Sequence, residues 1–318
     1  MSVNMDRPED VWKADVAESV SMYNEWFLRF APTAFAQTRD HVEDLVERCL
    51  SVTSYLTNIS PDVLSSDPGI ISTLRMSTCP PLAVDRLIGL AGVKASLVKT
   101  MEEGHRLPAR MSRADLFDEL TKIGAVIQQM ADYEVFPWLK VRRGPTDSEI
   151  HRASTIIADR LCTAQANPII RNEQEKRQLG KIKDWLDARG YRQIPVNQRV
   201  DFRDMQPGTY SFRLNVVVGE NNPVNIPVDA VIMPRRARPG SFPLLIEAKS
   251  AGDFTNTNKR RKEEAAKVNQ LHDTYGDDIN FVLFLCGYFG IGYLRYEAEE
   301  GIDWVWEHRI DDLAEFGL

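Results

Sequence analysis

The sequence predicts an all-α domain over residues 1–155, followed by an α/β (α+β, mixed-sheet) domain over residues 156–318. Apolar residues recur at helical spacing through the first half. After Gly190 the pattern changes to short apolar strands, interrupted by one long polar helix. Alternation of helices and strands in the second half is typical of a sheet covered by helices.

Helices account for the ordered part of the first 155 residues. We expect helices over Val42–Leu56 and Asp115–Tyr133, and a third from Asp147 to about Cys162. Proline- and glycine-rich breaks separate them, as at Asp67-Pro68-Gly69 and Leu107-Pro108.

Strands dominate the second half. A helix over Asn172–Arg189 precedes them, and Gly190 stands at its expected C-terminal cap. A second helix is expected over Lys259–Tyr275. The expected strands are Tyr191–Val196, Tyr210–Val218, Asn225–Met233, Leu244–Lys249, Asn280–Cys286, Tyr293–Tyr296 and Trp304–Trp306.

Composition excludes several classes of protein. Hydrophobic residues make up 43% and charged residues 27%, as in ordinary globular proteins rather than disordered or fibrous ones. No apolar run reaches the roughly 18 residues of a transmembrane helix, and the acidic N-terminus does not resemble a signal peptide. The four cysteines and five histidines show no metal-ligand spacing. We therefore expect a cytoplasmic protein with free thiols.

Charge is distributed unevenly. The chain has 39 Lys and Arg against 46 Asp and Glu, a net charge of −7. Residues 156–295 hold 21 basic against 16 acidic residues, whereas residues 296–318 hold 1 against 8. The central region can thus offer an anion-binding surface, although the whole chain is acidic.

Charged residues interrupt two apolar strands. Asp229 lies in the segment Ile226–Ile232, and Glu247 and Lys249 lie in Leu244–Lys249. Burying a charge is costly unless it is paired or binds a metal. Glu247 and Lys249 are two residues apart, so they project from one face of a strand. The loop Pro234–Pro243 suits a hairpin, which would bring Asp229 and Glu247 within reach of one cation.

These residue types suit phosphodiester hydrolysis. Two carboxylates bind a hard divalent cation, most plausibly Mg²⁺, and such an ion lowers the pKa of a bound water. Lys249 can orient that water and stabilise negative charge in the transition state.

A basic segment follows the second charged strand. Small polar residues lead into four basic residues at the start of the expected helix. Cations are unfavourable at a helix N-terminus, so a phosphate backbone is one explanation for them. A solvated face balanced by Glu263 and Glu264 is the other. The candidate DNA contacts are Asn256, Asn258, Lys259, Arg260, Arg261 and Lys262.

The helix that enters the α/β domain carries a further acid. Glu175, Leu179, Ile182 and Leu186 share one face at helical spacing. Glu175, rather than Glu173, is therefore expected to face inward, where it could contact the metal or its water. A first-turn acid that stabilises the helix dipole is the alternative.

Taken together, these features resemble the PD-(D/E)XK nuclease superfamily and, within it, the XamI-like type II restriction endonucleases. The similar blocks are RNEQEKRQL, IPVDAVI, LLIEAKSAGDFTNTNKRRKEEA and PPLAVDRLIGLAGVKASLVKTMEEG. The resemblance implies metal ligands at Asp229 and Glu247, a catalytic Lys249 and an accessory Glu175. One departure is that Val228 precedes Asp229, with the proline one position earlier at Pro227.

The helical domain contains a possible helix-turn-helix at about residues 84–102. Gly92 would lie in the turn, and Val93, Leu97 and Val98 would pack inward. In this motif the second helix enters the major groove. The outward-facing residues would be Lys94, Ala95, Ser96 and Lys99, and the candidate DNA contacts among them are Lys94, Ser96 and Lys99. An ordinary helical hairpin is the alternative.

The leading hypothesis is a Mg²⁺-dependent restriction endonuclease that cuts double-stranded DNA. One chain carries one set of site residues, so symmetric cutting of a palindrome implies a homodimer. A DNA methyltransferase encoded nearby would protect the host. The alternatives are a structure-specific repair or recombination nuclease and a helix-turn-helix regulator without catalysis. The helical domain would serve DNA recognition or dimerisation.

Overall fold

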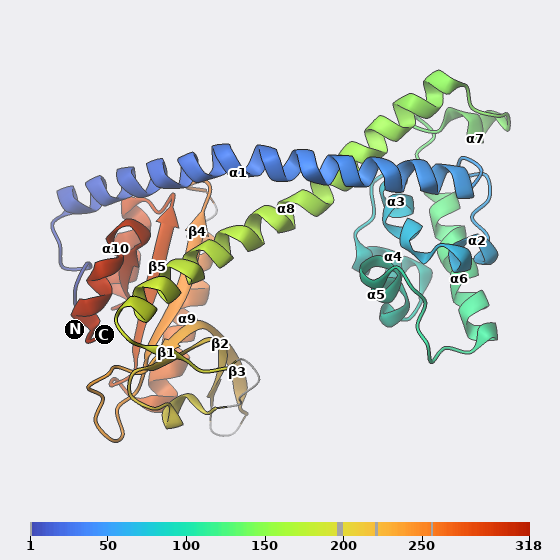
Figure 1. Cartoon of the computed structure of the whole chain (residues 1–318). Helices are drawn as coiled ribbons and strands as arrows, with labels where there is room; N and C mark the ends of the chain where they lie inside the picture. The colour runs from blue at the N-terminus through green and yellow to red at the C-terminus, as the bar shows by residue number, and fades with distance from the viewer. Residues whose placement is uncertain (1, 196–199, 220–221, 256) are drawn as a thin grey trace. The chain divides into compact units, whose positions relative to one another are not determined.

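The computed structural model describes residues 2–195, 200–219, 222–255 and 257–318, and the side chains of 257–261 are not described. The helices are α1 (Glu9–Val52), α2 (Pro61–Ser66), α3 (Ile71–Met76), α4 (Val84–Ala91), α5 (Ala95–Gly104), α6 (Arg113–Gln129), α7 (Pro137–Val141), α8 (Asp147–Ala188), α9 (Thr257–Tyr275) and α10 (Ile291–Glu299). The strands are β1 (Arg192–Gln193), β2 (Thr209–Val218), β3 (Val224–Ile232), β4 (Leu244–Ala251), β5 (Asn280–Gly287) and β6 (Asp303–Trp306). The fold is mixed α/β (Figure 1).

The chain forms two compact units. Residues 31–170 form one, here called the helical unit, and residues 1–30 together with 171–318 form the other, the sheet unit. This division differs from a single boundary after residue 155, because the first 30 residues belong with the C-terminal half. Helices α1 and α8 each contribute to both units.

Two long helices replace several shorter ones expected from the sequence. The expected helix Val42–Leu56 is the end of α1, and Asp147–Cys162 and Asn172–Arg189 are parts of one helix, α8. A capping box opens α8, in which Thr146 N–H donates to Glu149 Oε2 at 2.9 Å and Glu149 N–H donates to Thr146 Oγ1 at 3.3 Å. The helix ends before Gly190, whose φ of +76° is left-handed, as predicted.

The sheet has six strands in the order β1-β2-β3-β4-β5-β6. β2, β3 and β4 pair antiparallel, whereas β4, β5 and β6 pair parallel. All side chains of β5 except that of Asn280 are buried, as expected for a central parallel strand covered on both faces. The expected strand Tyr293–Tyr296 is wrong, because these residues lie in α10.

The error at Tyr293 has a local cause. Gly290 has extended backbone angles and caps α10, so the glycine-rich segment before it ends in a helix start rather than a strand. Tyr293, Leu294 and Glu297 are buried at helical spacing. The short run of aromatic residues therefore fits the buried side of a helix equally well.

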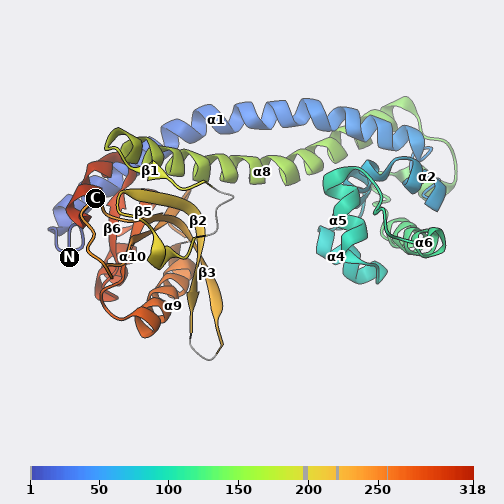
Figure 2. The same ribbon diagram turned by 60° about the horizontal axis from the view of Figure 1, so that its bottom comes forward.

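Two apolar cores cover the faces of the sheet. Helix α8 packs on one face, with Leu179, Ile182 and Leu186 against Ile232 and Ile246. Helices α9 and α10 and the start of α1 pack on the other. Figure 2 shows α8 and α9 on opposite sides of the sheet.

Strand β3 changes face within its length. Ile226 and Val228 belong to the core on the α9 side, but Ala230 and Ile232 belong to the core on the α8 side. Side chains on a regular strand alternate with period two, so the strand must turn over between Val228 and Ala230. On β2, Arg213 lies between the partners of these two residues and has φ +53°. Asp229 occupies this irregular point.

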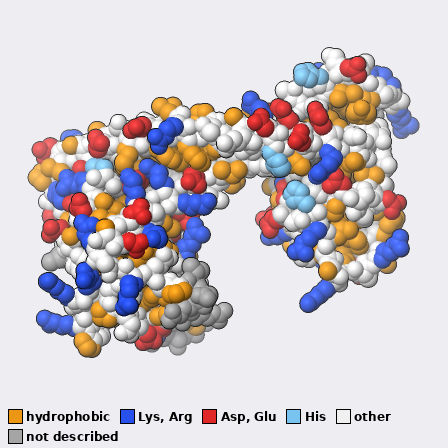
Figure 3. All heavy atoms as spheres, viewed as in Figure 1, with side chains coloured by type: hydrophobic (Ala, Val, Ile, Leu, Met, Phe, Trp, Pro, Cys, Tyr) orange, Lys and Arg blue, Asp and Glu red, His pale blue; other side chains and the backbone are white. Residues whose placement is uncertain are grey.

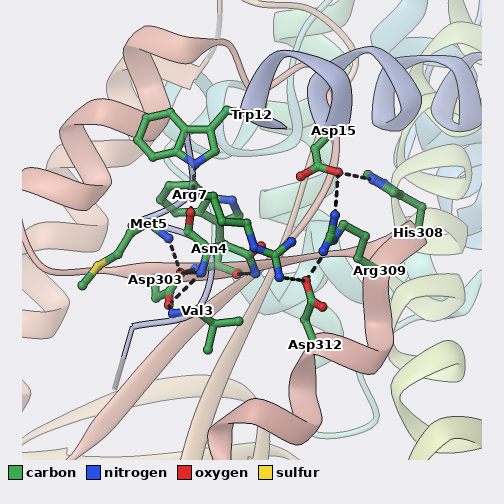
Figure 4. A network of polar contacts seen from close by, with 11 residues as sticks. Val3, Asn4, Met5, Arg7, Trp12, Asp15, Asp303, His308, Arg309 and Asp312 are labelled. Atoms are coloured by element: carbon green, nitrogen blue, oxygen red, sulfur yellow. Dashed lines mark hydrogen bonds and ion pairs between the residues drawn. The ribbon is translucent and has the colours of Figure 1, made fainter. Parts of the chain in front are cut away.

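The N-terminal segment is fastened to the edge strand β6. The backbone N–H groups of Val3, Asn4 and Met5 donate to the carboxylate of Asp303, Asn4 at 3.0 Å (Figure 4). Trp12 Nε1 donates to the Asn4 carbonyl at 2.8 Å, and its ring packs edge-on against Trp304. One buried carboxylate thus orders the beginning of the chain.

We expect Asp303→Ala to destabilise the protein by about 2–3 kcal/mol, because it leaves several backbone donors without an acceptor. Urea unfolding measures this loss. Asp6→Asn is the matched control, since Asp6 is exposed in the same segment. Equal stabilities of the two variants would contradict the assigned role of Asp303.

Candidate functional site

The structure brings together Asp229, Glu247 and Lys249. The antiparallel ladder of β3 and β4 ends at the pair Ala230–Ile246, and Asp229 and Glu247 are the next residues along the two strands, close enough for the charge of Glu247 to affect Asp229. Lys249 lies two residues beyond Glu247 on the same face of β4. The hairpin expected from the sequence is therefore present, with its loop over residues 233–243.

Asp229 is held in a fixed orientation. Ala248 N–H donates to Asp229 Oδ2 at 2.8 Å. Burial, followed by the negative charge of Glu247, raises the pKa of Asp229 to about 6, although the Ala248 N–H and Lys249 act in the opposite direction. Two neighbouring carboxylates that repel each other make a place where an added cation is favourable.

Two lysines bind Glu247, which is 9% exposed. Lys249 Nζ contacts Glu247 Oε1 at 3.0 Å, and Lys267 Nζ, from α9, contacts Oε2 at 2.8 Å. Burial tends to lower the pKa of Lys249, but the charges of Glu247 and Glu264 outweigh it and the pKa is raised. Each oxygen of Glu247 thus has its own ammonium partner.

Two site residues were not predicted from the sequence. Lys267 also donates to the Pro227 carbonyl at 3.1 Å, and Glu264 Oε1 lies 3.6 Å from Lys249 Nζ. Both belong to α9, a mostly polar helix whose few apolar residues, such as Val268 and Leu271, give only a weak helical pattern. The spacing of three residues between Glu264 and Lys267 is the pattern that would have placed them on one face.

Glu175 lies on α8 near this group. Its charge contributes to the raised pKa of Asp229, and Arg213 Nη2 contacts Glu175 Oε1 at 2.6 Å. Glu173 instead pairs with Lys176 at 3.6 Å on the helix surface. The neighbouring Gln178 is buried and donates to the Lys249 carbonyl at 3.2 Å, which ties α8 to β4.

The carboxylates of this group are those of Asp229 and Glu247, and Glu247 is paired with two lysines. Among the described residues, no group of three or more His, Cys, Asp or Glu side chains is arranged to hold an ion. Carboxylate oxygens are hard donors, the kind that a partly hydrated Mg²⁺ accepts.

The basic segment is described only in part. Lys262 is exposed on α9. The side chains of five predicted DNA contacts lie outside the described residues, namely Asn256, Asn258, Lys259, Arg260 and Arg261. On the face of the sheet unit visible in Figure 3, Lys and Arg side chains are interspersed with acidic ones.

Helices α4 and α5 are joined by a short turn at Gly92, whose φ of +61° is left-handed. Val93, Leu97 and Val98 are buried, as predicted. Among the predicted DNA contacts, Lys94, Ser96 and Lys99 are exposed. Lys94 Nζ is 3.8 Å from Glu119, and Lys99 Nζ is 4.0 Å from Asp85.

The model of the XamI restriction endonuclease family matches residues 54–306. The chain belongs to this family. It is 52% identical over 315 residues to the type II restriction enzyme SalI of Streptomyces albus G, covering 99% of both chains. It is also 22% identical over 218 residues to the type II restriction enzyme XamI of Xanthomonas campestris pv. amaranthicola, covering 66% of this chain and 72% of that one.

A solved structure, protein VC1899 from Vibrio cholerae, gives a TM-score of 0.28 at 12% identity, over 80% of this chain and 55% of that one. This similarity is too low to support an argument about the fold. The family and the near full-length relative identify the chain as a type II restriction endonuclease, which confirms the resemblance seen in the sequence. Within the described residues, no helix combines the length and hydropathy needed to cross a bilayer.

Proposed function

We propose that the restriction endonuclease cleaves double-stranded DNA at a PD-(D/E)XK-type site formed by Asp229, Glu247 and Lys249. The observation that supports this most directly is the pairing of β3 with β4, which sets two carboxylates and an ammonium on adjacent strands. The pKa of Asp229 is raised first by burial and then by the charge of Glu247, so a cation bound beside it would be favourable. The fold around it, a mixed sheet covered on both faces by helices, is compatible with this superfamily.

The proposed cofactor is Mg²⁺, with Asp229 and Glu247 as its protein ligands. When bound there, the ion would polarise the scissile phosphate and lower the pKa of a bound water. The Ala248 N–H fixes the carboxylate of Asp229, and the buried position of Glu247 limits its motion. The carboxylate of Asp229 is therefore oriented before a cation arrives, whereas Glu247 would give up part of its lysine contacts to the ion.

Lys249 and Glu175 have supporting roles in this proposal. The ammonium of Lys249 would orient the attacking water and stabilise the negative charge that develops on the phosphate. Glu175, which is close enough to influence Asp229, would contact the hydrated cation as an accessory acid. Its ion pair with Arg213 restrains the carboxylate of Glu175.

The helical unit is proposed to serve DNA recognition or dimerisation. The turn between α4 and α5 and the exposed residues Lys94, Ser96 and Lys99 support a helix-turn-helix reader. The basic segment would bind phosphates through Asn256, Asn258, Lys259, Arg260, Arg261 and Lys262. Membership of a restriction family disfavours the repair nuclease and the non-catalytic regulator. We also propose that the enzyme acts in the cytoplasm and that a DNA methyltransferase encoded nearby protects the host DNA from it.

Asp229→Ala should abolish Mg²⁺-dependent cleavage while leaving DNA binding intact or tighter, because it removes a ligand and a charge near phosphate. Gel assays of cleavage and binding measure both, and Asp273→Ala, on the exposed side of α9, is the control.

Asp229→Asn, which keeps a hydrogen-bond acceptor for the Ala248 N–H, should raise the melting temperature of the protein at pH 8. The gain should shrink as the pH falls below about 6 and disappear towards pH 4, because the cost of ionising Asp229 in the folded protein develops between its ordinary pKa and its raised pKa. Substantial cleavage by Asp229→Ala would disprove the assignment.

The active form on DNA should be a homodimer, because two strands of a palindrome need two sites related by a two-fold axis. Sedimentation of the protein with cognate duplex in Ca²⁺ should give two chains per duplex. A single chain bound per duplex at saturating protein would exclude this arrangement.

Arg260→Ala with Arg261→Ala should weaken binding to cognate and random duplex by similar factors, because phosphates carry no sequence information. The slope of log K against log salt should become shallower by about 0.9 for each phosphate that is no longer neutralised.

Ser96→Ala or Lys99→Ala should instead cost roughly 1–3 kcal/mol of binding free energy on the cognate site, with less effect on random DNA. Equal reductions in affinity on both duplexes for both sets would remove the helix-turn-helix from the proposal.

A further inference from the structure

A buried acid lies next to the ammonium group of Lys249. Glu264, on α9, is 2% exposed. Tyr293 OH donates to its Oε2 at 2.7 Å. Its other oxygen, Oε1, has no hydrogen-bond partner among the described residues and lies 3.6 Å from Lys249 Nζ. A buried carboxylate oxygen without a donor is costly, so its orientation towards the site calls for a functional explanation.

A second buried acid lies beside Glu264. Glu297, on α10, is completely buried beside Glu264 and Tyr293. Burial and then the charge of Glu264 raise the pKa of Glu297 to about 9. A raised pKa favours the protonated form of Glu297, which reduces repulsion between the two carboxyl groups. The ammonium of Lys249 is the cationic partner of Glu264, at 3.6 Å from Oε1.

Binding of a cation would change the ionic contacts of Glu247. Lys249 and Lys267 each occupy one oxygen of Glu247. If Glu247 becomes a ligand of a divalent cation, both ammonium groups lose part of this partner. Lys267 retains the Pro227 carbonyl at 3.1 Å, and Lys249 retains Glu264.

We propose that Glu264 is a positioning residue of the nuclease site, which holds the ammonium of Lys249 in place when Glu247 turns to the metal ion. The inference rests on the proposed assignment of Glu247 and Lys249. Glu264 acts entirely through Lys249: it neither binds the ion nor contacts DNA. Tyr293 fixes one oxygen of Glu264, which directs the other towards Lys249.

Glu264→Gln, with nearly the same shape and no charge, tests this role. Turnover should fall on the order of tenfold, the usual scale for residues that orient a catalytic group, with DNA affinity in Ca²⁺ unchanged. Mn²⁺ binding, measured by calorimetry without DNA, should weaken several-fold, because Lys249 then competes more strongly with the ion for Glu247. Glu264→Asp should recover part of both losses. Glu263→Gln is the matched control, since Glu263 is the exposed neighbour on α9.

A double variant separates positioning from direct metal binding. In a Lys249→Met background, Glu264→Gln should cause no further loss of Mn²⁺ affinity. A loss of the same size in that background would identify Glu264 as a ligand and overturn the proposal. Unchanged turnover and Mn²⁺ affinity in the single variant would also overturn it. If Asp229→Ala remains active, the site assignment itself fails, which is a distinguishable result.

Tyr293→Phe provides a second variant if Glu264→Gln does not fold. It removes the hydroxyl that donates to Glu264 Oε2 and keeps the aromatic ring. Turnover should fall by a smaller factor than in Glu264→Gln, again without a change in DNA affinity. Wild-type turnover in a folded Tyr293→Phe protein would argue against the proposal, because Glu264 would then need no orientation.

Discussion

The ionic contacts of Glu247 are the interaction on which the site depends. A carboxylate that is 9% exposed in the middle of a sheet is stable only if its charge is compensated. Lys249 supplies one contact from the same strand and Lys267 another from α9. Helix α9 is thereby attached to the sheet by charge as well as by its apolar residues Val268 and Leu271.

The face change in β3 explains how Asp229 joins this group. If β3 were regular along its whole length, residues of one parity would pack into one core, and the apolar pattern would leave no half-buried position for an acid. The change of face between Val228 and Ala230 gives Asp229 a half-buried position beside Glu247. Arg213, with its positive φ, lies at the same level on β2 and pairs with Glu175. Backbone irregularity and charged residues therefore coincide.

The sequence was sufficient to predict Asp229, Glu247 and Lys249 as neighbours, because charges in apolar strands and a hairpin loop are local features. It was not sufficient for Lys267 and Glu264. Their inward orientation depends on how α9 packs, and the few apolar residues of α9 give only a weak helical pattern. The two helices expected over Asp147–Cys162 and Asn172–Arg189 are parts of the single helix α8, which continues through Pro168.

Contacts between residues far apart in the sequence also determine which segments belong to each of the two units. Nothing in the first 30 residues distinguishes them from the helical sequence that follows, yet their partners, such as Asp303, are almost 300 positions away. Packing inside the helical unit was more predictable, because Val93, Leu97 and Val98 follow the periodicity of a helical hairpin.

The discontinuity of the sheet unit has a consequence for engineering. Because residues 1–30 fold with residues 171–318, the helical unit is topologically an insertion, entered through α1 and left through α8. The sheet unit cannot be obtained by truncating the chain at one point. It requires both segments, rejoined by a linker or expressed as two complementing fragments. Exchange of the helical unit between relatives likewise needs two crossover points, one within each long helix, with the rotational phase of both helices preserved.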